Sequence, residues 1–184
     1  MLEGTAIGKV GTTGGEICFN TGMTGYQEIY TDPSYYGQII VNTTAHIGNY
    51  GTVNEEQESE KPKISGLVVN DFSSEFSRKT ARESLQDYLE KNGVVGIADL
   101  DTRMLVRHLR SKGAMNAVIS SELGPDDLKK RLAEVPDMNG LELSSVVSTA
   151  KPYLFGPENA AIRIAALDFG IKTNILRCLE AVSY

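Results

Sequence analysis

The chain has 184 residues with a formal net charge of −6, and 41% of its residues are hydrophobic. This composition excludes a disordered or fibrous protein and fits one or two globular domains, because a chain of this size can bury roughly 70% of its unfolded surface. The 24 acidic residues outnumber the 18 basic ones, which argues against a nucleic-acid binder, whose target phosphates attract clustered positive charge.

Membrane, secretory and metal-binding classes are also disfavoured. No apolar run is long enough to span a membrane, and the first residues lack the order of a signal peptide. Cys18 and Cys178 lie far apart, and even with His46 and His108 they are not expected to build a disulfide framework or a four-ligand zinc site. We therefore expect a cytoplasmic protein without a membrane partner or a metal site.

The first third of the chain is predicted to form a small sheet. Strands are expected where alternating or β-branched residues stand between turn signals, over Gly15 to Thr21, Gln38 to Thr43 and Ile64 to Val69. Thr31 to Ser34 predicts a turn, because Pro33 fixes its own φ and disfavours helical backbone at Asp32. Asn54 to Lys63 carries charge without apolar periodicity and predicts an exposed loop.

Two helices are expected in the middle of the chain. Thr80 and Glu83 have the spacing of a capping box at the start of the first helix, and Gly93 marks its end. The second helix is expected to follow a cap at Asp99 or Asp101. Its inward-facing residues are expected to be Met104, Leu105 and Leu109. Short strands are predicted beside these helices, over Val94 to Ile97 and Asn116 to Ser120.

The last third contains a third helix and a change of composition. Pro125 to Ala133 predicts a helix, because proline suits the first helical position and the acidic start and basic end match the helix dipole. Ser148 to Ala160 contains two of the six prolines and predicts a domain boundary. The apolar run Ile162 to Leu167 predicts a buried parallel strand, which Asp168-Phe169-Gly170 turns into a helix. That helix is expected to bury Ile175, Leu176 and Leu179.

No pattern by itself assigns a reaction. Cys18, in a predicted strand, and Cys178, on the last predicted helix, are expected to be small buried hydrophobes. His46 is expected to make a structural hydrogen bond in its glycine-flanked loop. His108 lies at the edge of an apolar helix face and is expected to be packed or half-exposed.

Two further features suggest partners only weakly. Gly8 to Gly15 matches neither the dinucleotide nor the Walker phosphate-binding spacing and leads into a strand, so a hairpin turn is expected there. Arg103, Arg107 and Arg110 line one helix face and could meet an acidic partner, but a solvated face is the expectation from sequence alone.

Three longer segments together resemble one family. Gly15 to Gly51, GEICFNTGMTGYQEIYTDPSYYGQIIVNTTAHIGNYG, closely resembles the amino-terminal domain of the small, glutamine-dependent subunit of carbamoyl phosphate synthetase. Gly93 to Asn116 resembles a second signature of that family, and Ala166 to Leu176 (ALDFGIKTNIL) resembles the start of its class I glutamine amidotransferase domain. Segments of this length agree by chance far less often than short motifs do.

The resemblance implies an α/β fold with two parts. A swivelling β/β/α domain, a mixed sheet with helices, would be followed by the first β-α unit of a truncated doubly wound amidotransferase domain. Residues 1–150 would form the amino-terminal domain, residues 151–160 a linker, and residues 161–184 the start of the amidotransferase domain. The chain is accordingly expected to be shortened at both ends.

The resemblance also implies a function. The whole small subunit would hydrolyse glutamine and pass ammonia through an internal tunnel to a large subunit, which makes carbamoyl phosphate from bicarbonate and ATP. Such an enzyme is a ligase that feeds pyrimidine and arginine biosynthesis. ATP and Mg would bind the large subunit, and no cofactor is expected in this chain. The amino-terminal domain would help to dock the large subunit.

Within the chain, the resemblance assigns Ser34 to a contact with bound glutamine and Lys172 to the same site. A hydroxyl can donate to a carboxylate and accept from an amine, which suits Ser34 to this role. No catalytic residue is expected here, and Cys178 does not match the family's nucleophile, which stands in a glycine-flanked elbow. The chain should therefore be inactive alone in glutamine hydrolysis.

Two alternatives remain open from the sequence. The chain could be a stand-alone, non-catalytic docking module for the large subunit. It could also be an unrelated phosphate-binding module that uses Gly8 to Gly15, which titration with nucleotides or phosphate would reveal.

Overall fold

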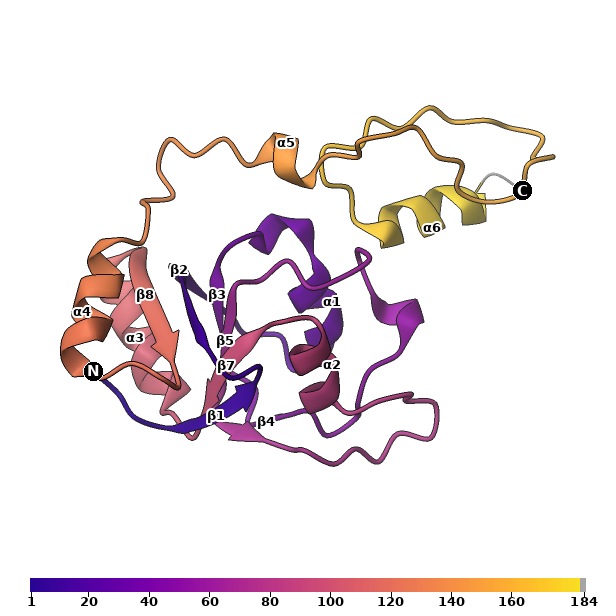
Figure 1. The fold of residues 1–184 in the computed structure, drawn as a ribbon. Helices are drawn as coiled ribbons and strands as arrows, with labels where there is room; N and C mark the ends of the chain where they lie inside the picture. The colour runs from indigo at the N-terminus through magenta and orange to yellow at the C-terminus, as the bar shows by residue number, and fades with distance from the viewer. Residues whose placement is uncertain (183–184) are drawn as a thin grey trace.

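A six-stranded mixed sheet organises the computed structural model, which describes residues 1–182 (Figure 1). The strands lie in the order β1-β7-β5-β3-β2-β8. Their bounds are β1 Thr5–Gly8, β2 Thr12–Asn20, β3 Ile39–Asn42, β5 Gly66–Val68, β7 Val95–Ala98 and β8 Met115–Ser120. The inner strands are parallel to one another, whereas β1 and β8 run antiparallel to their neighbours. The prediction of a mixed α/β fold is confirmed.

Helices cover both faces of this sheet. Their bounds are α1 Tyr26–Thr31, α2 Leu85–Lys91, α3 Thr102–Lys112 and α4 Pro125–Ala133. In Figure 1, α1 and α2 lie on one side of the sheet, and α3 and α4 lie on the other. A smaller parallel pair, β4 His46–Ile47 with β6 Asp71–Phe72, forms a second sheet.

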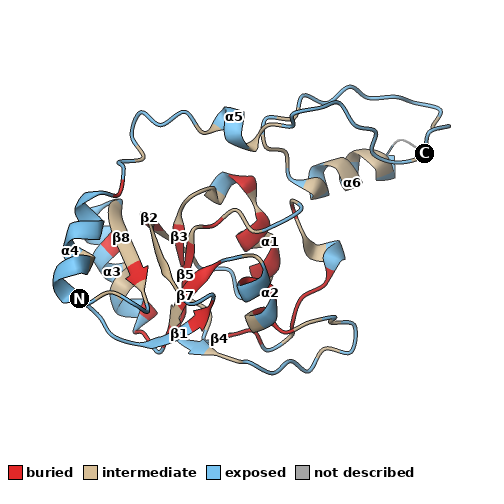
Figure 2. Ribbon diagram, viewed as in Figure 1, coloured by how far each residue is buried: buried red, intermediate tan, exposed pale blue. Residues whose placement is uncertain are grey.

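Strand β3 requires helical layers on both of its faces. All of its residues are buried, as is typical of a parallel strand covered on both sides. Ile40 packs into the cluster that contains residues of α1 and α2, whereas Ile39 and Val41 pack into the cluster that contains Leu109 of α3. Burying each such aliphatic side chain stabilises the fold by about 1.5–3 kcal/mol. Figure 2 shows buried residues gathered in the central strands and in α1.

The connection from Gly8 to Gly15 is not a hairpin, contrary to the prediction. β1 pairs with β7, whereas β2 pairs with β3 and β8. The Lys9 N–H donates to the Val94 carbonyl at 2.8 Å and so continues the pairing of β1 with β7. Ile7 is buried in the same cluster as the apolar residues of α2. The partner strand of β1 is therefore determined by burial of the apolar face of β1, and not by the turn residues between Gly8 and Gly15.

Helix α2 begins later than predicted. Ser84 caps it, since its hydroxyl accepts the Asp87 N–H at 3.0 Å and donates to the Asp87 carboxylate at 2.7 Å. Thr80 is exposed, and Glu83 precedes the helix, so the predicted capping box is wrong. A side-chain hydroxyl still caps the helix, but it is that of Ser84, four residues after Thr80 and directly before the first apolar residue of the helix, which is buried. The predicted end at Gly93 is confirmed, with φ at +76°.

Helix α3 begins after one of the two predicted caps, and α4 has its predicted bounds. Asp101 caps α3 by accepting the Met104 N–H at 2.8 Å, and Gly113 follows the last helical residue with φ at +88°. Leu109 is buried as expected, but Met104 is 41% exposed, so its predicted inward position is wrong. Met104 lies on the outer flank of the helix because Leu109 and its neighbours already face the sheet.

The last part of the chain is an extended segment that ends in a helix. Its helices are α5 Ser144–Val147 and α6 Thr173–Val182. The predicted buried strand over Ile162 to Leu167 is wrong, because this segment pairs with no strand in residues 1–182 and Leu167 is 82% exposed. A strand takes its hydrogen bonds from other strands, whereas a helix satisfies its own backbone. The helix prediction is confirmed, although Ile175 is 46% exposed and not buried. The last two residues of the predicted 161–184 segment lie outside the described residues.

We expect Ser84→Ala to lower the free energy of unfolding by about 1 kcal/mol, because it removes the acceptor for the Asp87 N–H at the start of α2. Urea denaturation followed by circular dichroism measures this change. Thr80→Ala is the matched control and should change the free energy by less than about 0.5 kcal/mol. A larger loss at Thr80 than at Ser84 would contradict the assigned cap.

Candidate functional site

Thr31 to Ser34 forms the turn that the sequence predicts, and this turn positions Ser34. Asp32 has extended backbone, with φ −67° and ψ 120°, as a residue before proline favours. Pro33 opens a short 3-10 turn, and the Asp32 Oδ1 accepts the Ser34 N–H at 2.9 Å. Ser34 is exposed at this point.

Helix α1, which leads into the turn, is capped from another part of the chain. Gly25 has no side chain to cap it, and the Tyr50 hydroxyl accepts the N–H groups of Gly25 and Tyr26 at 2.9 and 3.0 Å. The rings of Tyr26 and Tyr50 stack with their centroids 4.1 Å apart. Burial raises the pKa of both phenols above the ordinary value, so both stay protonated at neutral pH.

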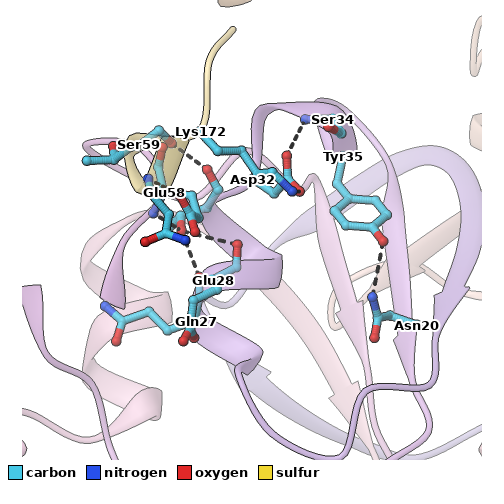
Figure 3. A network of polar contacts seen from close by, with 12 residues as sticks. Asn20, Gln27, Glu28, Asp32, Ser34, Tyr35, Glu58, Ser59 and Lys172 are labelled. Atoms are coloured by element: carbon cyan, nitrogen blue, oxygen red, sulfur yellow. Dashed lines mark hydrogen bonds and ion pairs between the residues drawn. The ribbon is translucent and has the colours of Figure 1, made fainter. Parts of the chain in front are cut away.

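Asp32 joins the two residues that the family resemblance assigns to the site. Its Oδ2 pairs with the Lys172 Nζ at 3.4 Å, while its Oδ1 holds the Ser34 N–H. Figure 3 shows Lys172 and Ser34 reaching Asp32 from opposite sides. The sequence predicts Asp32 only as a turn residue. Its place directly before Pro33 was the one signal that it caps the turn.

The turn before α6 brings Lys172 to this position. Burial would raise the pKa of Asp168, but hydrogen bonds from the Ile171 and Gly170 N–H groups, both at 2.9 Å, lower it below its ordinary value. Gly170 has φ at +95°, and a Cβ there would lie 2.7 Å from Val147 Cγ2 and 3.3 Å from Pro33 Cβ. The Asp-Phe-Gly turn therefore needs glycine, because of its positive φ and its close packing against Val147 of α5 and, less tightly, against the Ser34 turn.

A cavity of about 340 Å³ lies between these two turns. Its lining comes from the Ser34 turn and the residues that lead from it to β3, from the segment around α5, and from the Asp-Phe-Gly turn. The lining residues that carry hydroxyl or amide groups are Ser34, Tyr36, Gln38 and Ser144. The volume is at the small end of the range for ligand pockets, roughly 300–1,000 Å³, and suits a molecule the size of an amino acid.

The two cysteines differ in environment. Cys18 is half-buried and its thiol donates to the Gln38 Oε1 at 3.4 Å. Burial, with the nearby Glu16 carboxylate, raises the pKa of Cys18 to about 11, so this thiol is not a nucleophile at neutral pH. Cys178 is exposed on α6, so the prediction that it is a buried hydrophobe is wrong. The side of α6 on which it lies is not covered by the described residues.

The histidines and arginines lie away from the cavity. His46 Nδ1 lies 2.7 Å from the Asp71 Oδ2, which confirms a structural hydrogen bond. His108 is exposed on α3, as are Arg103, Arg107 and Arg110. This face of α3 is therefore solvated in the chain itself.

The backbone of Gly8 to Gly15 is not organised to bind phosphate. The Gly8 N–H donates to the Gln86 Oε1 at 2.8 Å, and the Gly11 N–H donates to the Ser121 Oγ at 2.9 Å. A phosphate loop presents such donors to its ligand. The phosphate-binding alternative has no support at this loop.

Within residues 1–182, no group of three His, Cys, Asp or Glu side chains is placed to hold a metal ion. In the same part of the chain, no helix combines the length and apolar character that a membrane crossing needs.

The fold and cavity define an α/β protein with a small-molecule-sized cavity between the Ser34 turn, the segment around α5 and the Asp-Phe-Gly turn. Residues 1–119 match the family model described as carbamoyl-phosphate synthase small chain, CPSase domain. The chain belongs to this family, and the resemblance seen in the sequence is confirmed.

Curated relatives support the same assignment. The chain is 47% identical over 184 residues to the carbamoyl phosphate synthase small chain of Chlorobaculum tepidum and 44% identical over 194 residues to that of Synechococcus sp.. It is 43% identical over 198 residues to that of Campylobacter jejuni. The matches cover 98%, 98% and 100% of this chain and 50%, 50% and 53% of those relatives. The chain thus spans about half the length of the curated relatives it matches.

We expect iodoacetamide at about pH 8 to modify Cys178 at least tenfold faster than Cys18, because Cys178 is exposed and Cys18 keeps its proton. Peptide mass spectrometry on samples quenched at intervals gives the two rates. Cys178→Ser is the control that leaves only the slow reaction, and urea should make Cys18 reactive. Equal rates in the folded protein would contradict the environment assigned to Cys18.

Proposed function

We propose that this chain supplies the amino-terminal domain of the small subunit of glutamine-hydrolysing carbamoyl phosphate synthase. The small subunit would release ammonia from glutamine, and a large subunit would convert it, with bicarbonate and ATP, to carbamoyl phosphate. The observation that carries the proposal is the Asp32 carboxylate, which holds Ser34 and Lys172 beside a cavity of amino-acid size. Family membership supports the reaction.

The finer architecture belongs to the same proposal. Residues 1–150 would be the swivelling β/β/α domain, residues 151–160 the linker, and residues 161–184 the start of a doubly wound class I glutamine amidotransferase domain. Leu167 and Phe169 are exposed in this last segment, as expected of apolar residues whose covering strands and helices lie elsewhere in the subunit.

The residues of this chain would bind and orient glutamine and would not attack it. The Ser34 hydroxyl would donate to the glutamine carboxylate or accept from its amine. Lys172 would add positive charge on the other side of Asp32, where it attracts a carboxylate. The nucleophile would come from the rest of the amidotransferase domain, since Cys178 lies on the outside of a helix. This chain alone would therefore be inactive.

The partners and setting follow from the reaction class. The large subunit would hold ATP and Mg, and this chain would need no cofactor of its own. The product would serve pyrimidine and arginine biosynthesis in the cytoplasm. Neither nucleic acid nor a membrane would be a partner.

One observation favours a second function, docking of the large subunit without any role in glutamine use. Arg103, Arg107 and Arg110 are exposed on α3, and none of them pairs with an acidic side chain of residues 1–182. Such a face can receive an acidic partner surface. Docking and glutamine binding are compatible, and the Ser34 experiment distinguishes a docking-only module from a glutamine-site component.

We expect Ser34→Ala, in a small subunit of full family length joined to its large subunit, to raise the glutamine KM about tenfold. Loss of a hydrogen bond to a charged group costs about 1.5–3 kcal/mol. Carbamoyl phosphate synthesis from free ammonia should stay within about twofold, because that route bypasses the glutamine site. Steady-state assays with glutamine and with ammonium chloride measure both routes.

Ser74→Ala is the matched control, because Ser74 is exposed and outside the cavity lining. It should leave both routes unchanged. Equal losses by both routes in Ser34→Ala would make Ser34 a folding residue. An unchanged glutamine KM would favour the docking-only module.

A further inference from the structure

Glu58 departs most clearly from its predicted environment. The sequence places it in an exposed charged loop over Asn54 to Lys63, yet only 9% of its surface is exposed. Its neighbour Glu60 is exposed, as predicted. A buried carboxylate requires hydrogen-bond partners to offset the loss of solvation, and those of Glu58 lie far along the chain.

The first partners of Glu58 lie at the start of α6. The Glu58 Oε2 accepts the Asn174 N–H at 2.8 Å, and the Glu58 carbonyl accepts the Thr173 N–H at 3.1 Å and its hydroxyl at 3.0 Å. The first N–H groups of a helix have no partner inside it and carry partial positive charge. Glu58 therefore caps α6 from a separate part of the fold.

The other partner of Glu58 is the end of α1. The Glu58 N–H donates to the Thr31 Oγ1 at 2.8 Å, and the Ser59 hydroxyl donates to the Thr31 carbonyl at 2.6 Å. Thr31 is fully buried. It directly precedes Asp32, just as Lys172 directly precedes Thr173.

These contacts close a ring. Thr31 contacts Glu58, Glu58 contacts Thr173, and the chain neighbours of Thr31 and Thr173 form the Asp32–Lys172 pair. In Figure 3, Glu58 and Ser59 lie near Lys172, which reaches toward Asp32. A shift of α6 would therefore move Lys172 away from Asp32 as well.

We propose that Glu58 is a positioning residue for glutamine use: it clamps the start of α6 to the end of α1 and thereby sets Lys172 against Asp32 beside the Ser34 cavity. This inference rests on the proposed function for its effect on glutamine. The clamp itself is a contact within this chain and is measured without activity.

The first experiment measures the clamp by amide hydrogen exchange in the assembled enzyme, with a small subunit of full family length. Glu58→Ala should speed exchange at Asn174 about tenfold, because the N–H loses its acceptor. Exchange in β3 should not change. Glu58→Gln keeps the side-chain shape and one acceptor oxygen, so it should raise the exchange rate at Asn174 by less. It replaces Glu58→Ala in this test if the alanine variant folds poorly. Glu60→Gln, on the exposed neighbour, is the control and should match the unsubstituted protein.

The second experiment measures the consequence for glutamine. Glu58→Ala should raise the glutamine KM about tenfold and change kcat from free ammonia by less than about twofold. A merely structural role would lower both routes together. If Glu58 acts through Lys172, then Glu58→Ala added to Lys172→Met should raise KM by less than about twofold further.

Each outcome bears on a different claim. Unchanged exchange at Asn174 in Glu58→Ala and Glu58→Gln overturns the clamp. Suppose that Lys172→Met raises the glutamine KM. If Glu58→Ala then speeds exchange at Asn174 but leaves the glutamine KM unchanged, the positioning role is overturned. If the effects of Glu58→Ala and Lys172→Met on the glutamine KM multiply fully in the double variant, Glu58 does not act through Lys172. If Ser34→Ala and Lys172→Met both leave glutamine use intact, the proposed function fails, while the exchange result still decides the clamp.

Discussion

The Asp32 carboxylate is the interaction on which the candidate site depends, because its two oxygens hold partners from distant parts of the chain. Oδ1 fixes the turn that presents Ser34, and Oδ2 pairs with Lys172. The Asp32 side chain is only 13% exposed, but Lys172 is 45% exposed, so solvent screens the pair. Its importance is therefore geometric: it fixes where the two side chains stand and adds little to the stability of the fold.

The two halves of the site rest on different kinds of support. The turn at Ser34 follows a helix packed on a sheet whose central strand is buried on both faces. The Lys172 half follows an extended segment with exposed apolar side chains, among them Leu154, Ile162 and Leu167. The first half belongs to the cooperative core, and the second is held by hydrogen bonds and one ion pair. Local opening should therefore begin in the second half.

Features with local causes could be predicted from the sequence. The bounds of α4 match because its proline and its charges lie within the segment, and the turn at Asp32 follows from the next residue being proline. Helix α1 is not predicted from the sequence, because its cap is the distant Tyr50 hydroxyl. Glu58 is predicted to be exposed, because its hydrogen-bond partners in α6 lie far along the chain. Ser34 and Lys172 came from family resemblance. Asp32, which joins them, follows only from the three-dimensional structure.

Helix α6 is joined to the Glu58 segment at its first residues and again at Arg177, whose guanidinium donates to the Gln57 carbonyl at 3.3 Å. Hydrogen bonds that the Thr173 and Asn174 N–H groups donate to Glu58 fix the position of the helix start. The Arg177 contact, one turn farther along, also restrains rotation of the helix about its axis. Ile175, also on α6, is exposed and free to face another surface. The Glu58 segment thus acts as an anchor, and a surface packed against Ile175 would take its orientation from the same contacts that place Lys172.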